Sequence, residues 1–96
     1  MAHTDLDGAT AARALAVMDE LVAYQRRKVL ELVQRIQPGL TDEDVRNIHD
    51  YPAVYNDPIF QFEDGQLAGF VAAHIALKAR LLGGTLSGEP SKPGTP

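Results

Sequence analysis

The sequence contains no cysteine and no long uninterrupted hydrophobic run. Without cysteine the chain can form no disulfide, no zinc–thiolate site and no thiol nucleophile. The longest apolar stretch, residues 67–77, is interrupted by Gly69 and His74 and is shorter than the ~18–20 residues that a membrane span requires. Serine occurs only at Ser87 and Ser91, and no phosphate-binding glycine motif precedes a helix. We therefore predict no enzyme, no cofactor and no membrane span.

Positive charge is also scarce, since nine lysines and arginines face thirteen acids for a net charge of −4. This balance disfavours non-specific binding to nucleic acid, which relies on basic side chains that displace counterions from phosphates. The N-terminus carries Asp5 and Asp7 where a secretory signal carries basic residues, so we expect a cytoplasmic protein. A chain of 96 residues forms one small domain. Because such a domain buries only ~60–65% of its unfolded surface, we expect a partner subunit.

Residues 9–37 are predicted to form one long helix, because they are strong helix formers without internal proline or glycine. Pro38 and Gly39 end it. Its apolar residues recur at helical spacing along one stripe: Ala11, Ala14, Leu15, Met18, Leu21, Val22, Val29, Leu32, Val33 and Ile36. Gln25 is the one polar residue in this seam. A buried glutamine there can set the register or the oligomeric state, but we expect its side chain to lean out to water at the edge of the stripe.

A short second helix is predicted over residues 42–50. Thr41 is a favourable N-cap, and the three acids that follow suit the positive end of the helix dipole. Leu40 and Val45 occupy the positions of a hydrophobic staple. The helix should end before Pro52. Few of its residues are apolar, so we expect a lid across the end of a bundle.

Residues 51–64 contain two prolines and an Asn-Asp-Pro turn signal, which predicts an ordered loop. Four of the six aromatic residues of the protein lie here: Tyr51, Tyr55, Phe60 and Phe62. These rings either plug the open side of a helical sandwich or form an exposed patch that binds a protein partner.

A third helix is predicted over residues 65–82, with Asp64 as its N-cap and Gly83-Gly84 as its stop. The helix is apolar on every side, a pattern typical of a helix buried on every side. One face should pack on the first helix. The opposite face consists of small residues that suit a two-fold dimer contact: Gly69, Ala72, Ala73, Ala76 and Ala79. In the competing interpretation, residues 51–62 fold over this face within one chain.

The predicted organisation is a flexible N-terminus (1–8), a single helical domain (9–82) and a disordered C-terminal tail (83–96) rich in glycine and proline. The fold class is all-α: a small helical bundle of a long helix, a lid helix, an aromatic loop and a buried helix, completed by dimerisation.

Two clusters of polar residues suggest alternative functions. His49, Asp50 and His74 are the candidates for an acid–base or metal site at a subunit interface, although no histidine has a ligand partner at helical spacing. Arg26, Arg27 and Lys28 are consecutive, so they point to three sides of a helix and form no basic stripe. Arg27, Glu31 and Arg35 share a face and predict an exposed ion-pair ladder. A dimer could still gather two basic clusters into a surface that contacts nucleic acid through the first helix.

The leading functional prediction is a non-catalytic protein–protein interaction module. We expect a small cytoplasmic homodimer that binds a protein partner through its central segment, because residues 41–64 combine the aromatic cluster with seven acids and one base. The alternatives are the dimeric regulator that contacts nucleic acid and the small metal or acid–base site.

Overall fold

The computed structural model describes residues 7–82, and every regular element in this range is helical, which confirms the all-α class. The elements are α1 (Gly8–Ile36), α2 (Asp42–Val45), the 3₁₀ turn η1 (Ile48–Asp50), α3 (Pro52–Tyr55) and α4 (Pro58–Leu81). The predicted tail and most of the predicted flexible N-terminus lie outside the described residues.

The long first helix forms as predicted to within one residue at each end. The Asp7 carboxylate accepts a hydrogen bond of 2.7 Å from the Thr10 amide and caps α1. The capping interaction places Asp7 and Gly8 in the ordered chain, although both were assigned to the flexible N-terminus. Beyond Ile36 the chain turns at Gly39, whose φ of 97° is readily adopted only by glycine.

The prediction of one continuous second helix over residues 42–50 is wrong, because this segment forms two short elements, α2 and η1. Thr41 does precede α2, and both its amide and its hydroxyl donate to the Asp44 carboxylate, at 2.8 and 3.1 Å. These bonds hold the pKa of Asp44 below its ordinary value. Helical geometry then stops, because Asn47 adopts φ −120° and ψ 38° and the chain continues as η1. Asparagine is unfavourable inside a helix, because its side chain hydrogen-bonds to nearby backbone groups in other conformations. The break lets Ile48 enter the core.

The predicted loop over residues 51–64 is also wrong, because most of it is helical. Pro52 and Pro58 each stand at the first position of a helix, where a missing amide proton costs nothing. The Asp57 carboxylate accepts from the Phe60 amide at 2.9 Å and caps α4. Helix α4 therefore starts well before Asp64, the predicted cap, which lies within the helix. The prolines mark helix starts in this segment.

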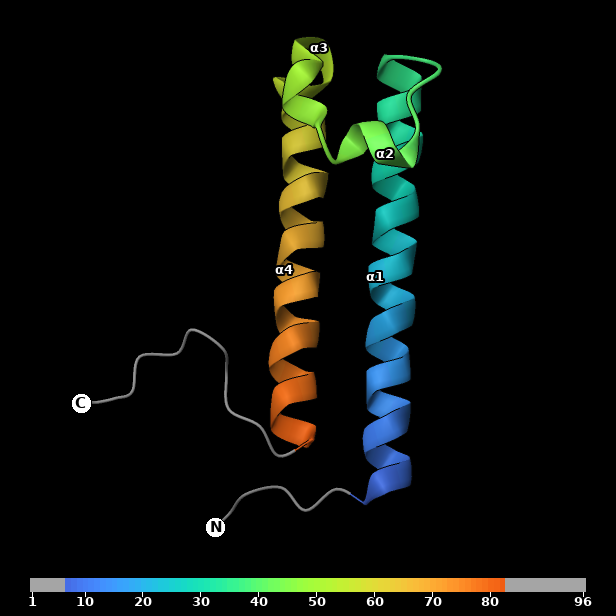
Figure 1. Ribbon diagram of the computed structural model, residues 1–96, viewed down its shortest axis with the longest axis vertical. Coiled ribbons are helices and arrows are strands. Elements are labelled where there is room, and N and C mark those ends of the chain that lie inside the picture. Colours follow the sequence, from blue (N-terminus) through green and yellow to red (C-terminus); the bar gives the residue numbers. More distant parts are fainter. Residues whose placement is uncertain (1–6, 83–96) are drawn as a thin grey trace, which may run out of the picture.

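Helices α1 and α4 lie side by side and antiparallel, and the short elements cover one end of the hairpin that they form (Figure 1). We call this the closed end. The hydrophobic core gathers there, where all five elements meet: Val29, Leu32, Val33, Leu40, Ile48, Val54, Phe60 and Leu67. Toward the other, open end, the one buried apolar residue of α1 is Ala11. Two helices alone leave their remaining apolar surface partly exposed.

A matched pair of valines tests where the core lies. Val54 of α3 is fully buried and Val17 of α1 is 61% exposed. We expect Val54→Ala to lower the free energy of unfolding by about 2 kcal/mol, since it removes two buried methyl groups and leaves a cavity. Val17→Ala should change it by less than about 0.5 kcal/mol. Urea denaturation measures both variants, and equal losses would contradict this position of the core.

Candidate functional site

The two long helices are joined by a polar link beside the core. Gln25 of α1 is only 2% exposed, and its amide nitrogen donates two hydrogen bonds to Glu63 of α4. One goes to the Glu63 carbonyl oxygen at 2.9 Å and the other to its carboxylate at 2.7 Å. The prediction that Gln25 leans out to water is therefore wrong. Burial is tolerated because Glu63 supplies acceptors for the amide.

Lys28 completes this link from the solvent side. Its ammonium nitrogen lies 3.4 Å from the second carboxylate oxygen of Glu63. The hydrogen bond from Gln25, and secondly the interaction with Lys28, hold the pKa of Glu63 below its ordinary value. The carboxylate is thus stabilised in its charged form at the boundary between the helices. Sequence reasoning counted Glu63 only among the acids of the central segment and did not predict this link, since its partners lie on a distant part of the chain.

The histidines do not form the predicted acid–base or metal site within one chain. His49 of η1 packs its ring against Tyr55 at the closed end, edge to face, with 6.5 Å between ring centres. His74 lies far along α4, and its Nε2 is 3.1 Å from the Asp19 carboxylate of α1. Within residues 7–82, no group of three or more acidic or histidine side chains is placed to hold a metal ion.

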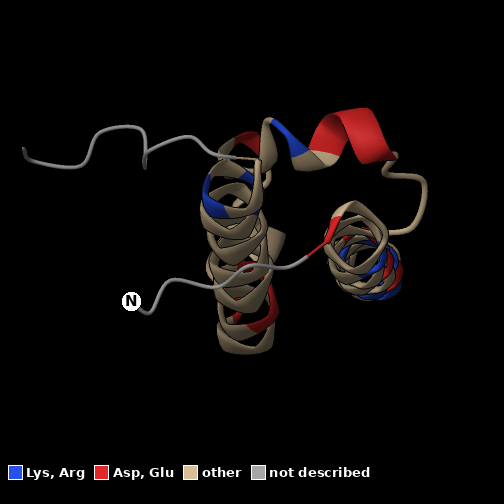
Figure 2. Ribbon diagram, turned by 90° about the horizontal axis from the view of Figure 1, so that it is seen from below, with Lys and Arg blue, Asp and Glu red and all other residues tan. Residues whose placement is uncertain are grey.

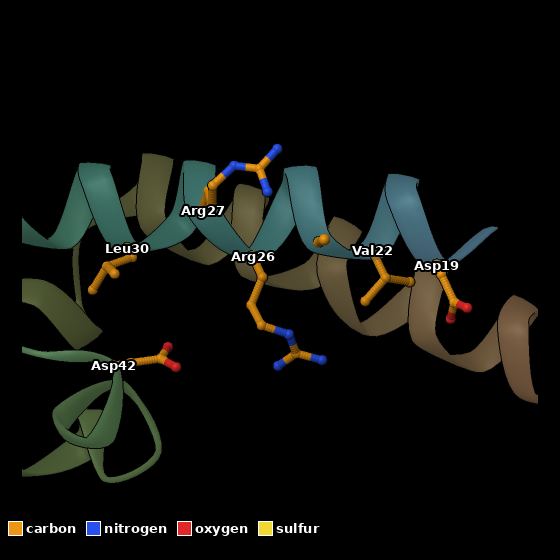
Figure 3. Close-up of a pocket in the computed structure, with 7 residues that line it drawn as sticks. Asp19, Val22, Arg26, Arg27, Leu30 and Asp42 are labelled. Carbon is orange, nitrogen blue, oxygen red and sulfur yellow. The ribbon is translucent and has the colours of Figure 1, made fainter. Parts of the chain in front are cut away.

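An open groove runs along α1 beside the start of α2 (Figure 3). Its volume is about 370 Å³, and Val22 and Leu30 contribute apolar lining. The Arg26 side chain extends away from α1 into the space between Asp19 and Asp42, whereas Arg27 points the opposite way. Mixed charges around an apolar floor suit a side chain of another protein better than one strongly charged ligand.

A second hollow, of about 310 Å³, lies along α1 and is lined by Tyr24, Arg27, Lys28, Glu31 and Arg35. Three of these five residues are basic, so the hollow is locally positive. The predicted ladder does not form: among the described residues, the ion pairs within 4.0 Å are Lys28–Glu63 and His74–Asp19, and neither involves Glu31. Arg27 and Lys28 share this hollow despite being neighbours in sequence.

The predicted partner-binding aromatics divide between core and surface. Phe60 is buried in the core, so it is unavailable to a partner. Tyr51 is half-buried against the core, and its hydroxyl donates to the Asp44 carboxylate at 3.1 Å. Tyr55 and Phe62 are exposed. Phe60 and Phe62 differ because the segment is helical, where residues two apart point to different sides.

The side of α4 that faces away from α1 carries the predicted dimer residues. Phe60 and Leu67 point toward α1, and residues about half a turn from them around the helix face outward. We define the outer face of α4 by these outward residues and the two large apolar residues that border them: Phe62, Gly65, Ala68, Gly69, Ala72, Ala73, Ile75, Ala76 and Ala79. Phe62 and Ile75 are 61% and 55% exposed. Residues 51–62 do not cover this face, because they fold at the closed end.

Comparison of the chain with protein-family models, with curated proteins and with solved structures finds no match. Over the part of the chain that the structure describes, none of the helices combines the length and apolar character needed to cross a membrane. Within residues 7–82, the outer face of α4 is an apolar surface on which Phe62 and Ile75 remain exposed.

The acid sensitivity of the fold tests the link between Gln25 and Glu63. Because the folded-state pKa of Glu63 is lowered, its contribution is complete above about pH 4.3, the ordinary value in unfolded chains, and is lost as the pH falls through the folded-state pKa. We expect Glu63→Gln to flatten the decline of the unfolding free energy on acidification, measured by urea denaturation between about pH 3 and 6.

The matched control is Glu31→Gln, which removes an exposed carboxylate of α1 and should leave this decline unchanged. Asp44 contributes acid sensitivity of the same sign in both variants, since its pKa is also lowered. A Glu63→Gln protein as acid-sensitive as the wild type would show that the link does not stabilise the charged carboxylate.

Proposed function

We propose that the protein is a non-catalytic interaction module that works as a homodimer. The single observation that carries this proposal is the exposed apolar outer face of α4. Contiguous apolar surface bordered by polar residues is typical of protein–protein contacts in water-soluble chains. A helix with little charge along most of its length gains more from a protein partner than from water.

The open end of the hairpin supports the same proposal. Here Leu15, Met18 and Val22 of α1 are only half-buried, and Leu77 and Leu81 of α4 are also half-buried. Two helices have too few neighbours to enclose these side chains, whereas four helices packed side by side do so. Both long helices therefore keep apolar surface that association with another chain would remove from water.

A protein partner would then bind at the closed end. Tyr55 and Ile59 are exposed there, at 47% and 61%, and Asp50 is exposed close by in sequence. An exposed aromatic beside carboxylates suits a partner that presents apolar and basic side chains. This surface retains the acidic and aromatic character of the central segment. Phe60 and Tyr51 do not contribute to it, because Phe60 is part of the core and Tyr51 packs against the core.

The test of the homodimer compares two substitutions of exposed alanines. We expect the wild type to sediment as a dimer at about 100 μM, and Ala72→Glu on the outer face to sediment as a monomer, because a charge buried in a contact costs several kcal/mol. Ala16→Glu on α1 is the control and should remain dimeric. Circular dichroism checks that both variants stay helical. A monomeric wild type at this concentration would refute the proposal.

A second candidate function is nucleic-acid binding through α1, favoured by the hollow that brings Arg27, Lys28 and Arg35 together around Tyr24. Basic side chains bind phosphates, and an aromatic ring can stack on a base. The net charge of −4 opposes this function. The local arrangement is nonetheless more favourable than the sequence predicted.

Salt dependence of binding distinguishes this second candidate. If this function holds, the wild type binds single-stranded DNA. Combining Arg27→Ala with Arg35→Ala then makes the negative slope of log affinity against log salt less steep by about 1.4. Substituting Arg13 and Arg46, two exposed bases outside the hollow, should leave the slope unchanged. Absence of binding by the wild type at about 50 mM salt would eliminate this function.

A further inference from the structure

An ion pair between the long helices marks one flank of the hairpin. The Lys28 ammonium of α1 lies 3.4 Å from the Glu63 carboxylate of α4. Residues seven apart on a helix lie on nearly the same side, because seven residues make almost two full turns. The flank therefore continues through Leu21 of α1 and Phe70 of α4. Since the helices are antiparallel, both residues lie on the open-end side of the ion pair (Figure 1).

This flank is apolar from the ion pair toward the open end. A further seven residues along, Ala14 of α1 and Leu77 of α4 follow on the same two sides. Val17 and Leu21 are 61% and 36% exposed, and Phe70 and Leu77 are half-buried. We call Val17, Leu21, Phe70 and Leu77 the apolar flank. Apolar residues presented together by two adjacent helices form the kind of surface on which a further helix packs in a bundle.

On the other side of the ion pair the same stripe of α1 becomes basic. The stripe repeats at alternating steps of four and three residues: Val17, Leu21, Tyr24, Lys28, Glu31 and Arg35. Its last four members, with Arg27, line the second hollow. Figure 2 shows the contrast between the helices, since α1 carries both signs of charge and α4 is almost entirely tan.

The positive charge of this hollow is only partly neutralised within the chain. Three of its five residues are basic and one is acidic, although the net charge of the whole protein is −4. Glu63 pairs with Lys28. Among residues 7–82, no carboxylate lies within 4.0 Å of the Arg27 or Arg35 guanidinium. These two guanidinium groups can therefore accept carboxylates from another molecule.

We propose that the apolar flank and the second hollow together bind an acidic amphipathic helix of a partner protein. Its apolar stripe covers the apolar flank, and its carboxylates meet Arg27 and Arg35. Nucleic acid matches this surface less well, because phosphates would satisfy the hollow and leave Val17 and Leu21 in water. The surface is separate from the outer face of α4, so this inference goes beyond the proposed homodimer and does not rest on it.

Two synthetic amphipathic helices test the charge of the partner. Each is about 20 residues long with leucines along one stripe, and the polar positions at one end are glutamates in one peptide and lysines in the other. We expect the wild type to bind the glutamate peptide at least about tenfold more tightly, as measured by isothermal titration calorimetry. Equal affinities, or no binding of the glutamate peptide at about 1 mM, would overturn the proposal.

Single substitutions test the two halves of the surface separately. Leu21→Gln should weaken binding of the glutamate peptide about tenfold, whereas Leu82→Gln, which changes an exposed leucine on another side of α4, should leave it unchanged. Arg35→Glu should weaken binding of the glutamate peptide about tenfold and strengthen binding of the lysine peptide. Arg46→Glu, outside the hollow, is its control. Circular dichroism checks that all four variants stay helical.

Other occupants of the surface give different results, each of which would overturn the proposal. If Leu21→Gln sediments as a monomer where the wild type is a dimer, a second copy covers the apolar flank. If single-stranded oligothymidine binds the wild type, neither peptide binds, and Arg35→Glu but not Leu21→Gln weakens oligothymidine binding, the hollow binds nucleic acid. A monomeric wild type that binds the glutamate peptide would refute the proposed homodimer and support this inference.

Discussion

A helix that is apolar on all sides needs neighbours on all sides, and this constraint governs the whole molecule. Helix α4 packs one side against α1, where Phe60 and Leu67 are buried. The short elements pack at the start of α4 without covering its outer side, so Phe62 and Ile75 remain exposed. The hydrophobic effect that drives the two helices together is thus satisfied on one side of α4 and unsatisfied on the other. The proposed homodimer follows from this imbalance.

The closed and open ends of the hairpin differ in how they are stabilised. At the closed end, the core includes residues from α1, from the lid elements and from α4. Thr41 caps α2, and the short elements η1 and α3 that follow bring Ile48 and Val54 into that core. Among residues 7–82, α1 and α4 have only each other toward the open end.

The polar link at Gln25 adds specificity to an otherwise apolar seam. Its amide meets both the carbonyl and the carboxylate of Glu63, so the two helices have one register in which these groups are satisfied. Sliding by one residue would leave a buried amide without acceptors. Lys28 reinforces the same register from the solvent side. The apolar residues of both helices tolerate several registers more readily, since alanine and leucine pack with little directional preference.

Much of the local structure could be predicted from the residues alone. Helical periodicity and the absence of internal breakers determined α1, and Pro38-Gly39 determined its end. Proline was ambiguous, because Pro58 reads as a turn signal in Asn-Asp-Pro but also suits the first turn of a helix, and Asp57 resolves the ambiguity by capping it. The small residues of the dimer prediction do face away from α1, because spacing around a helix is a local property.

Contacts between distant residues were decided only by the tertiary structure. Gln25 looks the same in sequence whether it meets water or Glu63, and the difference of 38 positions between them hides the pairing. Phe60 and Phe62 are chemically identical, yet one is core and the other surface because α4 begins at Pro58. Sequence determined where helices form, since propensity and capping act within a few residues. Tertiary packing determined which of their faces are buried, since burial depends on elements far apart in the chain.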